Sequence, residues 1–255
     1  MLQNPTFELL HELRLPGMRA ALQEQQEMRD VEELTFEDRL ALLLEREKTD
    51  RANRRFQRLL GQARLHLEAT LEDLNFTKAR GMDRSLILRL GDCEWIRRGQ
   101  SVLLVGATGS GKSYLACALG HQACRHGLSV RYFRLSRLLD ELRLARGDGS
   151  RTRLLQRLAR AHLLILDDWG LAPLDDTARH DLLEVLDDRY GRRGTLLTSQ
   201  VPIDHWHEIV GDPTFGDAIL DRLLHNAHRI TLKGGSMRRV YDSTKGDAPG
   251  PDQPE

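Results

Sequence analysis

The chain of 255 residues contains 38 basic and 38 acidic side chains, and 40% of its residues are hydrophobic. This composition can fill a core, which excludes wholesale disorder, and no apolar run approaches the ~20 residues of a transmembrane helix. The N-terminus has neither the basic nor the apolar segment of an export signal, so we expect a cytoplasmic protein with no membrane partner. Cys93, Cys117 and Cys124 are odd in number and form no CxxC pair, so neither a metal site nor a disulfide is expected. Cys117 and Cys124 are seven residues apart, two helical turns, and are expected to be buried thiols.

The first 73 residues are predicted to form a small all-α domain. Apolar residues recur at helical spacing on both sides of Pro16-Gly17, which predicts two short helices separated by a break. Thr35 and Asp38 then fit the capping box that precedes many helices. The apolar pattern after them continues to Leu67 and predicts one long amphipathic helix, either continuous or interrupted near Lys48–Asp50.

Strand-sized apolar segments alternate with helical stretches beyond a connector over residues 74–100. The segments are Ser101–Val105, Ser129–Phe133, Leu163–Leu166, Thr195–Thr198 and Arg229–Leu232. The first four are almost continuously apolar, as is typical of strands buried on both faces. The alternation predicts an α/β domain over residues 74–245, with a parallel sheet flanked by helices. Residues 246–255 contain no core residues and are expected to be a disordered tail.

A phosphate-binding loop follows the first of these segments. Residues 106–113 match the pattern G-x-x-x-x-G-K-S/T without a mismatch, between a predicted strand and a predicted helix. Backbone amides of such a loop surround phosphate oxygens, and the helix N-terminus favours the negative charge. We expect Lys112 to contact the β- and γ-phosphates of ATP and Ser113 to bind Mg²⁺. The predicted nucleotide site comprises Gly106, Ala107, Thr108, Gly109, Ser110, Gly111, Lys112, Ser113 and Tyr114.

Two adjacent carboxylates, Asp167 and Asp168, follow the apolar segment Leu163–Leu166. Carboxyl ends of parallel strands meet at one edge of a sheet, so Asp167 is predicted to hold Mg²⁺, directly or through water. Asp168 is predicted to polarise the water that attacks the γ-phosphate. The alternative for Asp168 is a solvated loop acid or a helix cap.

Segments around both motifs resemble the IstB group of AAA+ ATPases, the ATP-binding helper proteins of IS21-family transposons. The resemblance rests on the two motifs, on Asp167–Leu174 and Thr198–Pro202, and on Leu13–Met18 and Gly235–Arg238. It spans about residues 5–245. The group is also similar to the helicase loader DnaC and the initiator DnaA. The resemblance therefore implies a P-loop AAA+ fold that hydrolyses ATP and assembles as a homo-oligomer.

The resemblance also implies sensor residues. Gln200 stands where AAA+ proteins keep a polar sensor of the γ-phosphate, although the usual residue is Asn, and Thr198 is the alternative. Arg238 matches the second sensor, which contacts ATP, and the adjacent Arg239 is the alternative.

Arg222 matches the arginine finger of the loader group. Such a finger acts in trans and stabilises charge at the γ-phosphate of the neighbouring subunit. The alternative is a helix-surface salt bridge with Asp221 or another neighbour.

Two arginine-rich stretches are predicted to contact the phosphate backbone of duplex DNA, with little base readout. On the long helix, four arginines share one face: Arg51, Arg54, Arg55 and Arg58. Between the second and third strands, where the resemblance implies nucleic-acid contact, lie Arg137, Arg143, Arg146, Arg151, Arg153 and Arg157. A turn at Gly147–Ser150 would separate two helices in this second stretch. The alternatives are solvated helix faces or contact with another subunit.

Three functions are compatible with these features. The favoured one is a DNA-dependent ATPase that assembles on target DNA and assists the transposase of an IS21-type element. A helicase-loading adaptor similar to DnaC would share every nucleotide-site residue. A small-molecule P-loop kinase is the third, and the basic stretches together with Arg222 argue against it.

Overall fold

The computed structural model describes residues 5–29, 31–76 and 81–233. Arg238, Arg239 and the expected tail therefore lie outside the described residues. The chain divides into two compact units, Met1–Leu59 and Leu60–Glu255. The division comes before residue 73, the expected boundary, because the segment after the long helix packs within the second unit. There Leu65 lies against Gly120, and Glu72 forms an ion pair with Arg125.

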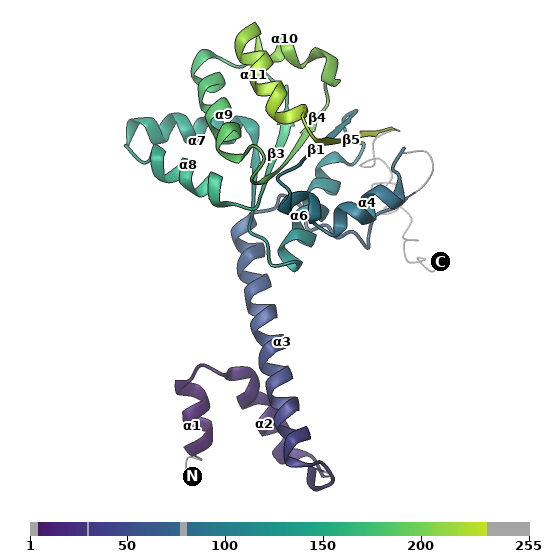
Figure 1. Cartoon of the computed structure of the whole chain (residues 1–255), viewed down its shortest axis with the longest axis vertical. Helices are drawn as coiled ribbons and strands as arrows, with labels where there is room; N and C mark the ends of the chain where they lie inside the picture. Colours follow the sequence, from purple (N-terminus) through teal and green to yellow (C-terminus); the bar gives the residue numbers. More distant parts are fainter. Residues whose placement is uncertain (1–4, 30, 77–80, 234–255) are drawn as a thin grey trace, which may run out of the picture. The chain divides into compact units, whose positions relative to one another are not determined.

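The first unit is helical, as predicted. Its elements are α1 (Pro5–Glu12), α2 (Pro16–Glu27), a 3₁₀ turn η1 (Val31–Glu33) and the greater part of α3 (Phe36–Ala63) (Figure 1). Pro16 begins α2 rather than ending a helix, because the first helical turn needs no donor from its backbone nitrogen. The capping box is present: the Asp38 amide donates to Thr35 Oγ1 at 3.2 Å. The alternative of an interruption near Lys48–Asp50 is wrong, because α3 is continuous there.

Helix α2 meets α3 where Gly17 faces Glu47. A β-carbon at residue 17 would lie 2.7 Å from Glu47 Cα, so only glycine permits this approach. The Glu47 carboxylate is buried and accepts hydrogen bonds from the amides of Gly17, at 2.7 Å, and Met18, at 3.2 Å. Burial alone would raise the pKa of Glu47, but Arg51 and these two amides hold the pKa below its usual value. The carboxylate thus satisfies donors that the start of α2 leaves unpaired.

The second unit contains a five-stranded parallel sheet in the order β2-β3-β4-β1-β5. The strands are β1 (Ser101–Gly106), β2 (Val130–Arg134), β3 (Leu163–Trp169), β4 (Gly194–Ser199) and β5 (Ala227–Leu232). All five predicted segments are therefore strands. The expectation of burial on both faces holds for β1, β3 and β4 but is wrong for β2, which alternates between buried and half-buried residues. Strand β2 lies at the sheet edge, where only one neighbouring strand covers it.

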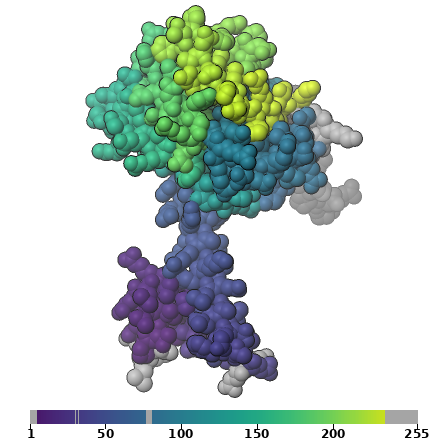
Figure 2. Space-filling model, in the orientation of Figure 1, coloured from purple at the N-terminus to yellow at the C-terminus, as the bar shows by residue number. Residues whose placement is uncertain are grey.

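Helices cover both faces of this sheet (Figure 1). They are α4 (Arg84–Gly91), α5 (Glu94–Arg97), α6 (Lys112–Arg125), α7 (Leu135–Gly147), α8 (Arg151–Arg160), α9 (Asp176–Arg189), a 3₁₀ turn η3 (Ile203–His205), α10 (Trp206–Val210) and α11 (Pro213–Leu224). Ile165 of β3 contacts α6, whereas its neighbours Leu164 and Leu166 belong to the core beneath α7, α8 and α9. The space-filling view shows α7, α8 and α9 as one continuous surface (Figure 2). The predicted turn between α7 and α8 is confirmed, with the Ser150 amide bonded to Asp148 Oδ1.

The remaining sequence expectations concern cysteines, metals and membranes. All three cysteines are buried and unpaired with one another. Among the described residues, no group of three His, Cys, Asp or Glu side chains could hold a metal ion. Within the same ranges, no helix is both long and apolar enough to cross a bilayer.

Candidate nucleotide site

The phosphate-binding loop connects β1 to α6, and two of its glycines adopt backbone angles that favour glycine. Gly109 and Gly111 have φ angles of +79° and +100°, in a region that other residues rarely adopt. A β-carbon on Gly106 would lie 2.4 Å from the Leu232 carbonyl oxygen, so the loop packs directly against β5. At Gly111, by contrast, a β-carbon would meet no atom within 4 Å, which leaves open space beside the loop amides.

The polar side chains of the loop fit phosphate. Lys112 Nζ donates to the carbonyl oxygens of Gly106, at 2.7 Å, and Ala107, at 2.8 Å. Burial lowers the pKa of Lys112, whereas the charges of Asp167 and Asp168 raise it. The buried Ser110 hydroxyl has no hydrogen-bond partner among the described residues. An ammonium group and an unused hydroxyl, beside a helix N-terminus, form a donor set that suits phosphate oxygens.

Asp167 gathers three hydroxyl groups from three elements. Ser113 Oγ, at the start of α6, donates to Asp167 Oδ1 at 3.0 Å, although the two residues are 54 positions apart. Thr198 of β4 donates to the same oxygen, and Tyr132 of β2 donates to Oδ2 at 2.5 Å. A hydroxyl and a carboxylate in contact are the hard oxygen ligands that Mg²⁺ prefers. The structure therefore brings Ser113 and Asp167 together, as the sequence predicted.

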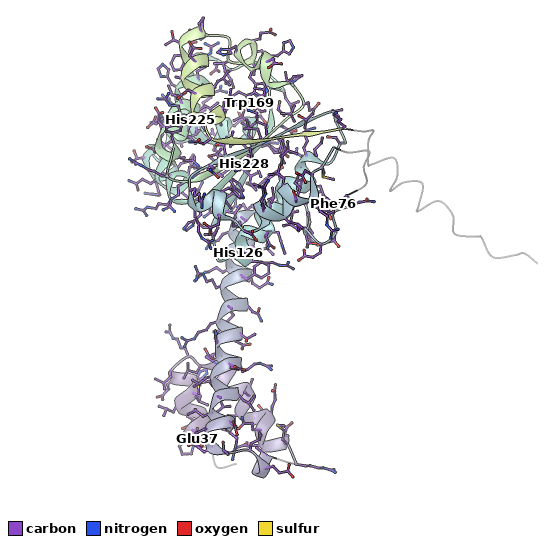
Figure 3. The ribbon with its side chains drawn as sticks, turned by 45° about the vertical axis from the view of Figure 1, so that its right-hand side comes forward. Glu37, Phe76, His126, Trp169, His225 and His228 are labelled. Carbon is purple, nitrogen blue, oxygen red and sulfur yellow. The ribbon has the colours of Figure 1, made fainter. Side chains whose placement is uncertain are left out.

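Asp168 departs from regular strand geometry. Its φ is +66°, and the pairing of β3 with β4 shifts register between Leu166 and Trp169. Consecutive side chains of a regular strand point to opposite faces, so this irregularity redirects the second carboxylate. Both carboxylates are close enough to raise the pKa of Lys112. Figure 3 labels the buried Trp169, which directly follows Asp168 and so locates this end of β3.

The surroundings of Asp168 distinguish it from a helix cap. Its amide donates to Thr198 Oγ1 at 3.1 Å, and its carboxylate lies 3.9 Å from Arg134 Nε. Burial and the charge of Asp167 raise the pKa of Asp168. The following helix, α9, is capped by Asp175 instead. The helix-cap alternative is therefore wrong.

The two candidates for the γ-phosphate sensor occupy different positions. Gln200 Oε1 accepts a hydrogen bond from Thr108 Oγ1 of the phosphate-binding loop at 2.6 Å. Thr198 is fully buried, and its hydroxyl bonds to Asp167 and to the Asp168 amide. Gln200 is thus the candidate beside the loop, whereas Thr198 holds the two acidic residues in place.

Arg222 lies at the other end of the sheet from its own phosphate-binding loop. Arg222 lines a pocket together with Ser101, the first residue of β1, and Thr195, the second residue of β4. The phosphate-binding loop follows the opposite end of β1. Its Nε is 2.6 Å from Asp187 Oδ1, and its Nη1 is 3.6 Å from Asp221 Oδ2. The salt bridge considered from the sequence is present, with Asp187 of α9 as the nearer partner. This position prevents Arg222 from serving its own chain's nucleotide.

The arginines of the predicted DNA surfaces differ in their charge partners. In the first unit, Arg51 and Arg54 both lie near the buried Glu47 carboxylate, at 2.8 and 3.3 Å, although both side chains are exposed, as is that of Arg58. Arg55, in the same stripe, is also exposed. Half of this stripe is therefore partly neutralised by a buried acid.

In the second stretch, ion pairs hold four of the six predicted arginines. Arg146 and Arg151 both form ion pairs with the buried Asp181, and Arg151 also forms one with Glu184. Arg143 forms an ion pair with Asp175. Arg157 forms one with Glu141. Within the described part of the chain, Arg137 and Arg153 have no carboxylate within 4.0 Å. The sequence reasoning treated this stretch as one basic surface, but acids from α7 and α9 neutralise much of it.

A pocket of about 310 Å³ remains strongly basic. Four arginines line it, from β2 and α8: Arg131, Arg153, Arg157 and Arg160. Burial, followed by the charges of Arg157 and Arg64, lowers the pKa of Arg131, which shows how closely the cations gather. Arg131 and Arg160 were not among the predicted DNA contacts.

Sequence reasoning also missed two side chains that contact the acids. Tyr132 and Arg134 stand at the carboxyl end of β2, beside Asp167 and Asp168 respectively. Their signal was their position, because polar residues at the carboxyl end of a parallel strand commonly line the ligand site.

Comparison with known proteins agrees with this geometry. Residues 8–245 match the model of the IstB-like ATP binding protein family. The chain belongs to this family. It is 51% identical to insertion sequence ATP-binding protein y4pL of Sinorhizobium fredii, over 94% of this chain and 98% of that protein. It is 34% identical to the IS21 ATP-binding protein of Pseudomonas aeruginosa, over 90% and 87% of the two chains.

Solved structures of replication proteins share the fold of this IstB-like chain. The DnaC helicase loader aligns with a TM-score of 0.57 and 20% identity, over 65% of this chain and 97% of DnaC. AMPPCP-bound DnaA from Aquifex aeolicus aligns with a TM-score of 0.56 and 16% identity, over 71% of this chain and 55% of that DnaA chain. The second unit thus shares the fold of these replication proteins, and the predicted α/β fold with a parallel sheet flanked by helices is confirmed.

Proposed function

We propose that this IstB-like protein is a DNA-dependent ATPase that assembles on target DNA and assists the transposase of an IS21-type element. The observation that carries the ATPase assignment is the 3.0 Å contact between Ser113 and Asp167 beside the phosphate-binding loop. Membership of a family named for ATP binding, with relatives in insertion sequences, supports the link to transposition.

Each residue of the site has a distinct task in this proposal. Lys112 leaves the loop carbonyls to contact the β- and γ-phosphates. Ser113 and Asp167 would hold Mg²⁺, which would neutralise phosphate charge when bound. Asp168 orients and polarises the attacking water, and Gln200 senses the γ-phosphate. These assignments follow from the donor and acceptor chemistry around the loop.

We assign Arg222 to the neighbouring subunit's nucleotide. Its distance from its own loop supports this role, because a homo-oligomer can bring it to the next γ-phosphate. The Asp187 carboxylate then competes with that phosphate for the guanidinium group. Active sites between subunits would make ATP turnover depend on assembly.

Duplex DNA is the proposed polyanion. The basic pocket of α8 and the exposed Arg55 and Arg58 of α3 would contact backbone phosphates. Guanidinium groups suit such contacts because they form paired hydrogen bonds with phosphate oxygens. A solved structure of DnaA contains AMPPCP and single-stranded DNA, but its likeness to this chain extends only to the fold.

A helicase-loading role is the second candidate. The likeness to DnaC favours it only at the level of the fold, because the two chains are 20% identical. The 51% identical relative is an insertion sequence protein, which favours transposition. A transposase is accordingly the proposed protein partner.

ATP turnover with and without duplex DNA tests the function. We expect Lys112→Ala to lose nucleotide affinity and turnover, since it removes the phosphate-binding charge. Asp168→Asn should keep ATP affinity, lose turnover and prolong DNA complexes, because it removes only the carboxylate charge. Wild-type turnover in folded Lys112→Ala would refute the site, and loss of ATP binding in Asp168→Asn would make Asp168 a metal ligand instead.

A further inference from the structure

A pocket at the amino ends of β1 and β4 gathers positive charge beside neutral polar groups. It encloses about 120 Å³ at the opposite end of β1 from the phosphate-binding loop. Four arginines line it: Arg98, Arg189, Arg193 and Arg222. Ser101 and Thr195 line it too, as does His225 at the end of α11, which Figure 3 labels. Among the described residues, its lining contains no aspartate or glutamate, so the pocket suits an anion.

The buried Arg189 indicates that the chain does not itself balance this charge. Its side chain is 1% exposed, and its guanidinium donates to uncharged oxygen atoms, three of them backbone carbonyls. In the described part of the chain, no carboxylate lies within 4.0 Å of this group. Burial, followed by the charge of Arg193, lowers the pKa of Arg189, so a second cation lies near it. Buried charges normally have a partner of opposite sign, and the adjacent pocket offers the place for one.

The other three arginines differ in how far they are available. Arg98 is exposed and Arg193 is half-buried, and within the described ranges neither has a carboxylate within 4.0 Å. Arg222 is held by α9, because its Nε lies 2.6 Å from Asp187 Oδ1. Arg98 and Arg193 are therefore the cations that can meet a ligand without first breaking an ion pair.

The volume of the pocket limits the size of that ligand. One water molecule needs only ~10–15 Å³, and pockets for drug-sized molecules begin near ~300 Å³. A volume of about 120 Å³ lies between these limits, so it has room for one tetrahedral oxyanion but not for a whole nucleotide. Arg98 precedes β1 and Arg193 precedes β4, so the two guanidinium groups come from different segments. Such groups form paired hydrogen bonds with phosphate oxygens, which makes a single phosphate group the best fit.

We propose that this pocket is a second phosphate site, in which Arg98 and Arg193 bind one phosphate group and the buried Arg189 contributes charge. Arg222 also lines the pocket, so a bound phosphate competes with Asp187 for its guanidinium group. Two sources can supply this chemistry: free inorganic phosphate, or the terminal phosphate of a nucleotide on a neighbouring subunit. The site goes beyond the proposed function, whereas the second source rests on it.

The first arm of the test measures phosphate alone, without nucleotide or DNA. Inorganic phosphate is titrated by calorimetry, at constant ionic strength, into dilute Lys112→Ala, whose loop lacks its phosphate-binding charge. We expect a single phosphate to bind per chain. Adding Arg193→Gln or Arg98→Gln should weaken the phosphate Kd about tenfold, because each removes a charge-assisted hydrogen bond. Arg192→Gln is the matched control, since it removes the same charge from an exposed neighbour outside the pocket lining.

The second arm identifies the source of the phosphate. Assembly with Mg²⁺-AMPPCP is followed by sedimentation at increasing protein concentration, in the presence of an intact Lys112. If the neighbouring nucleotide supplies the phosphate, dilute Lys112→Ala should not bind free phosphate. In that case Arg193→Gln should raise the concentration needed for assembly about tenfold relative to Arg192→Gln.

Urea unfolding establishes that each variant is folded, and Arg98→Gln tests the site from a separate segment. The inference is overturned if folded Arg193→Gln and Arg98→Gln match Arg192→Gln both in phosphate Kd and in assembly. Failure of the proposed function has a different signature. A wild-type chain without ATP turnover, in which phosphate still binds and Arg193→Gln weakens that binding, would refute the ATPase and retain the second phosphate site.

Discussion

At the scale of single residues, Arg189 holds three elements of the second unit together from inside the core. Its guanidinium donates to the carbonyl oxygens of Leu158, at 2.6 Å, and Ala161, at 2.9 Å, and also to that of Gly194. A fourth bond reaches Thr195 Oγ1. Burial lowers the pKa of Arg189 to about 9, still above neutral pH, so the cation persists at neutral pH.

Replacing Arg189 should therefore be costly. Arg189→Met removes every donor of this buried network and deprives three carbonyl oxygens of a hydrogen bond, so we expect a loss of about 3 kcal/mol or more in the free energy of unfolding. Urea unfolding measures this loss. The exposed Arg192→Met is the control and should change stability by less than about 0.5 kcal/mol. Equal effects of the two substitutions would show that the buried network contributes little.

At the scale of elements, the contact between α2 and α3 depends on the absence of a side chain at residue 17. Gly17→Ala places a methyl group 2.7 Å from Glu47 Cα, so the helices must separate and the bonds to the Glu47 carboxylate must lengthen. We expect the free energy of unfolding of the first unit to fall by about 1–3 kcal/mol. Amide hydrogen exchange at Met18 and circular dichroism measure it.

Gly61→Ala on α3 is the matched control for this substitution. A β-carbon there meets no atom within 4 Å, and alanine favours helix over glycine by about 1 kcal/mol. We therefore expect Gly61→Ala to leave stability unchanged or raise it. Faster exchange of the Met18 amide in Gly61→Ala, but not in Gly17→Ala, would contradict the packing argument.

Helix α8 contributes most of the basic pocket and allows a test of DNA contact. Arg153→Gln combined with Arg160→Gln should flatten the dependence of DNA affinity on salt by about 0.9 in log–log slope for each lost phosphate contact. Arg143→Gln combined with Arg146→Gln removes the same charge from arginines already paired with carboxylates. We expect this second pair to leave the slope nearly unchanged, as titrations at several salt concentrations would show.

If Arg143→Gln with Arg146→Gln flattened the salt slope more than Arg153→Gln with Arg160→Gln, DNA would be assigned to the α7–α9 side instead. Equal slopes in wild type and both variants would mean that these arginines are only solvated or structural. This second result would redirect the DNA assignment to α3, where Arg55 and Arg58 are exposed.

At the scale of the whole molecule, completion of the site by a second subunit is the main expectation. Arg222→Ala should bind ATP nearly normally but lose ~10³-fold or more in turnover, as for other trans arginines. Mixing Arg222→Ala with Lys112→Ala should restore some activity, because an intact Arg222 on one subunit can face an intact Lys112 on another. Turnover of the mixture, compared with each variant alone, measures this recovery.

Asp187→Asn separates the two roles of Arg222. This substitution removes the 2.6 Å ion pair but leaves the guanidinium group available to a neighbour. A finger in trans predicts retained or increased turnover in Asp187→Asn. No recovery in a mixture with demonstrated co-assembly, together with a loss of turnover in Asp187→Asn, would instead assign Arg222 to a structural salt bridge.

The sequence by itself determined the parts of this protein that depend on local backbone chemistry. The loop over residues 106–113 needs glycine at particular φ angles and a lysine and serine at the start of a helix, all within eight consecutive positions. The apolar runs of β1, β3 and β4, which the structure buries almost completely, likewise identify the central strands. Asp167 was predictable because carboxyl ends of parallel strands meet.

Only the tertiary structure decided which charges remain available and which side chains meet near the acids. Arg146 and Arg151 form a basic pattern in the sequence, but the buried Asp181 that neutralises them lies 30 or more positions away. His66 and Tyr132, 66 positions apart, meet only because the segment after α3 packs beside an edge strand. Periodicity reports which face of an element is apolar, but strand order and packing determine which polar side chains meet across elements.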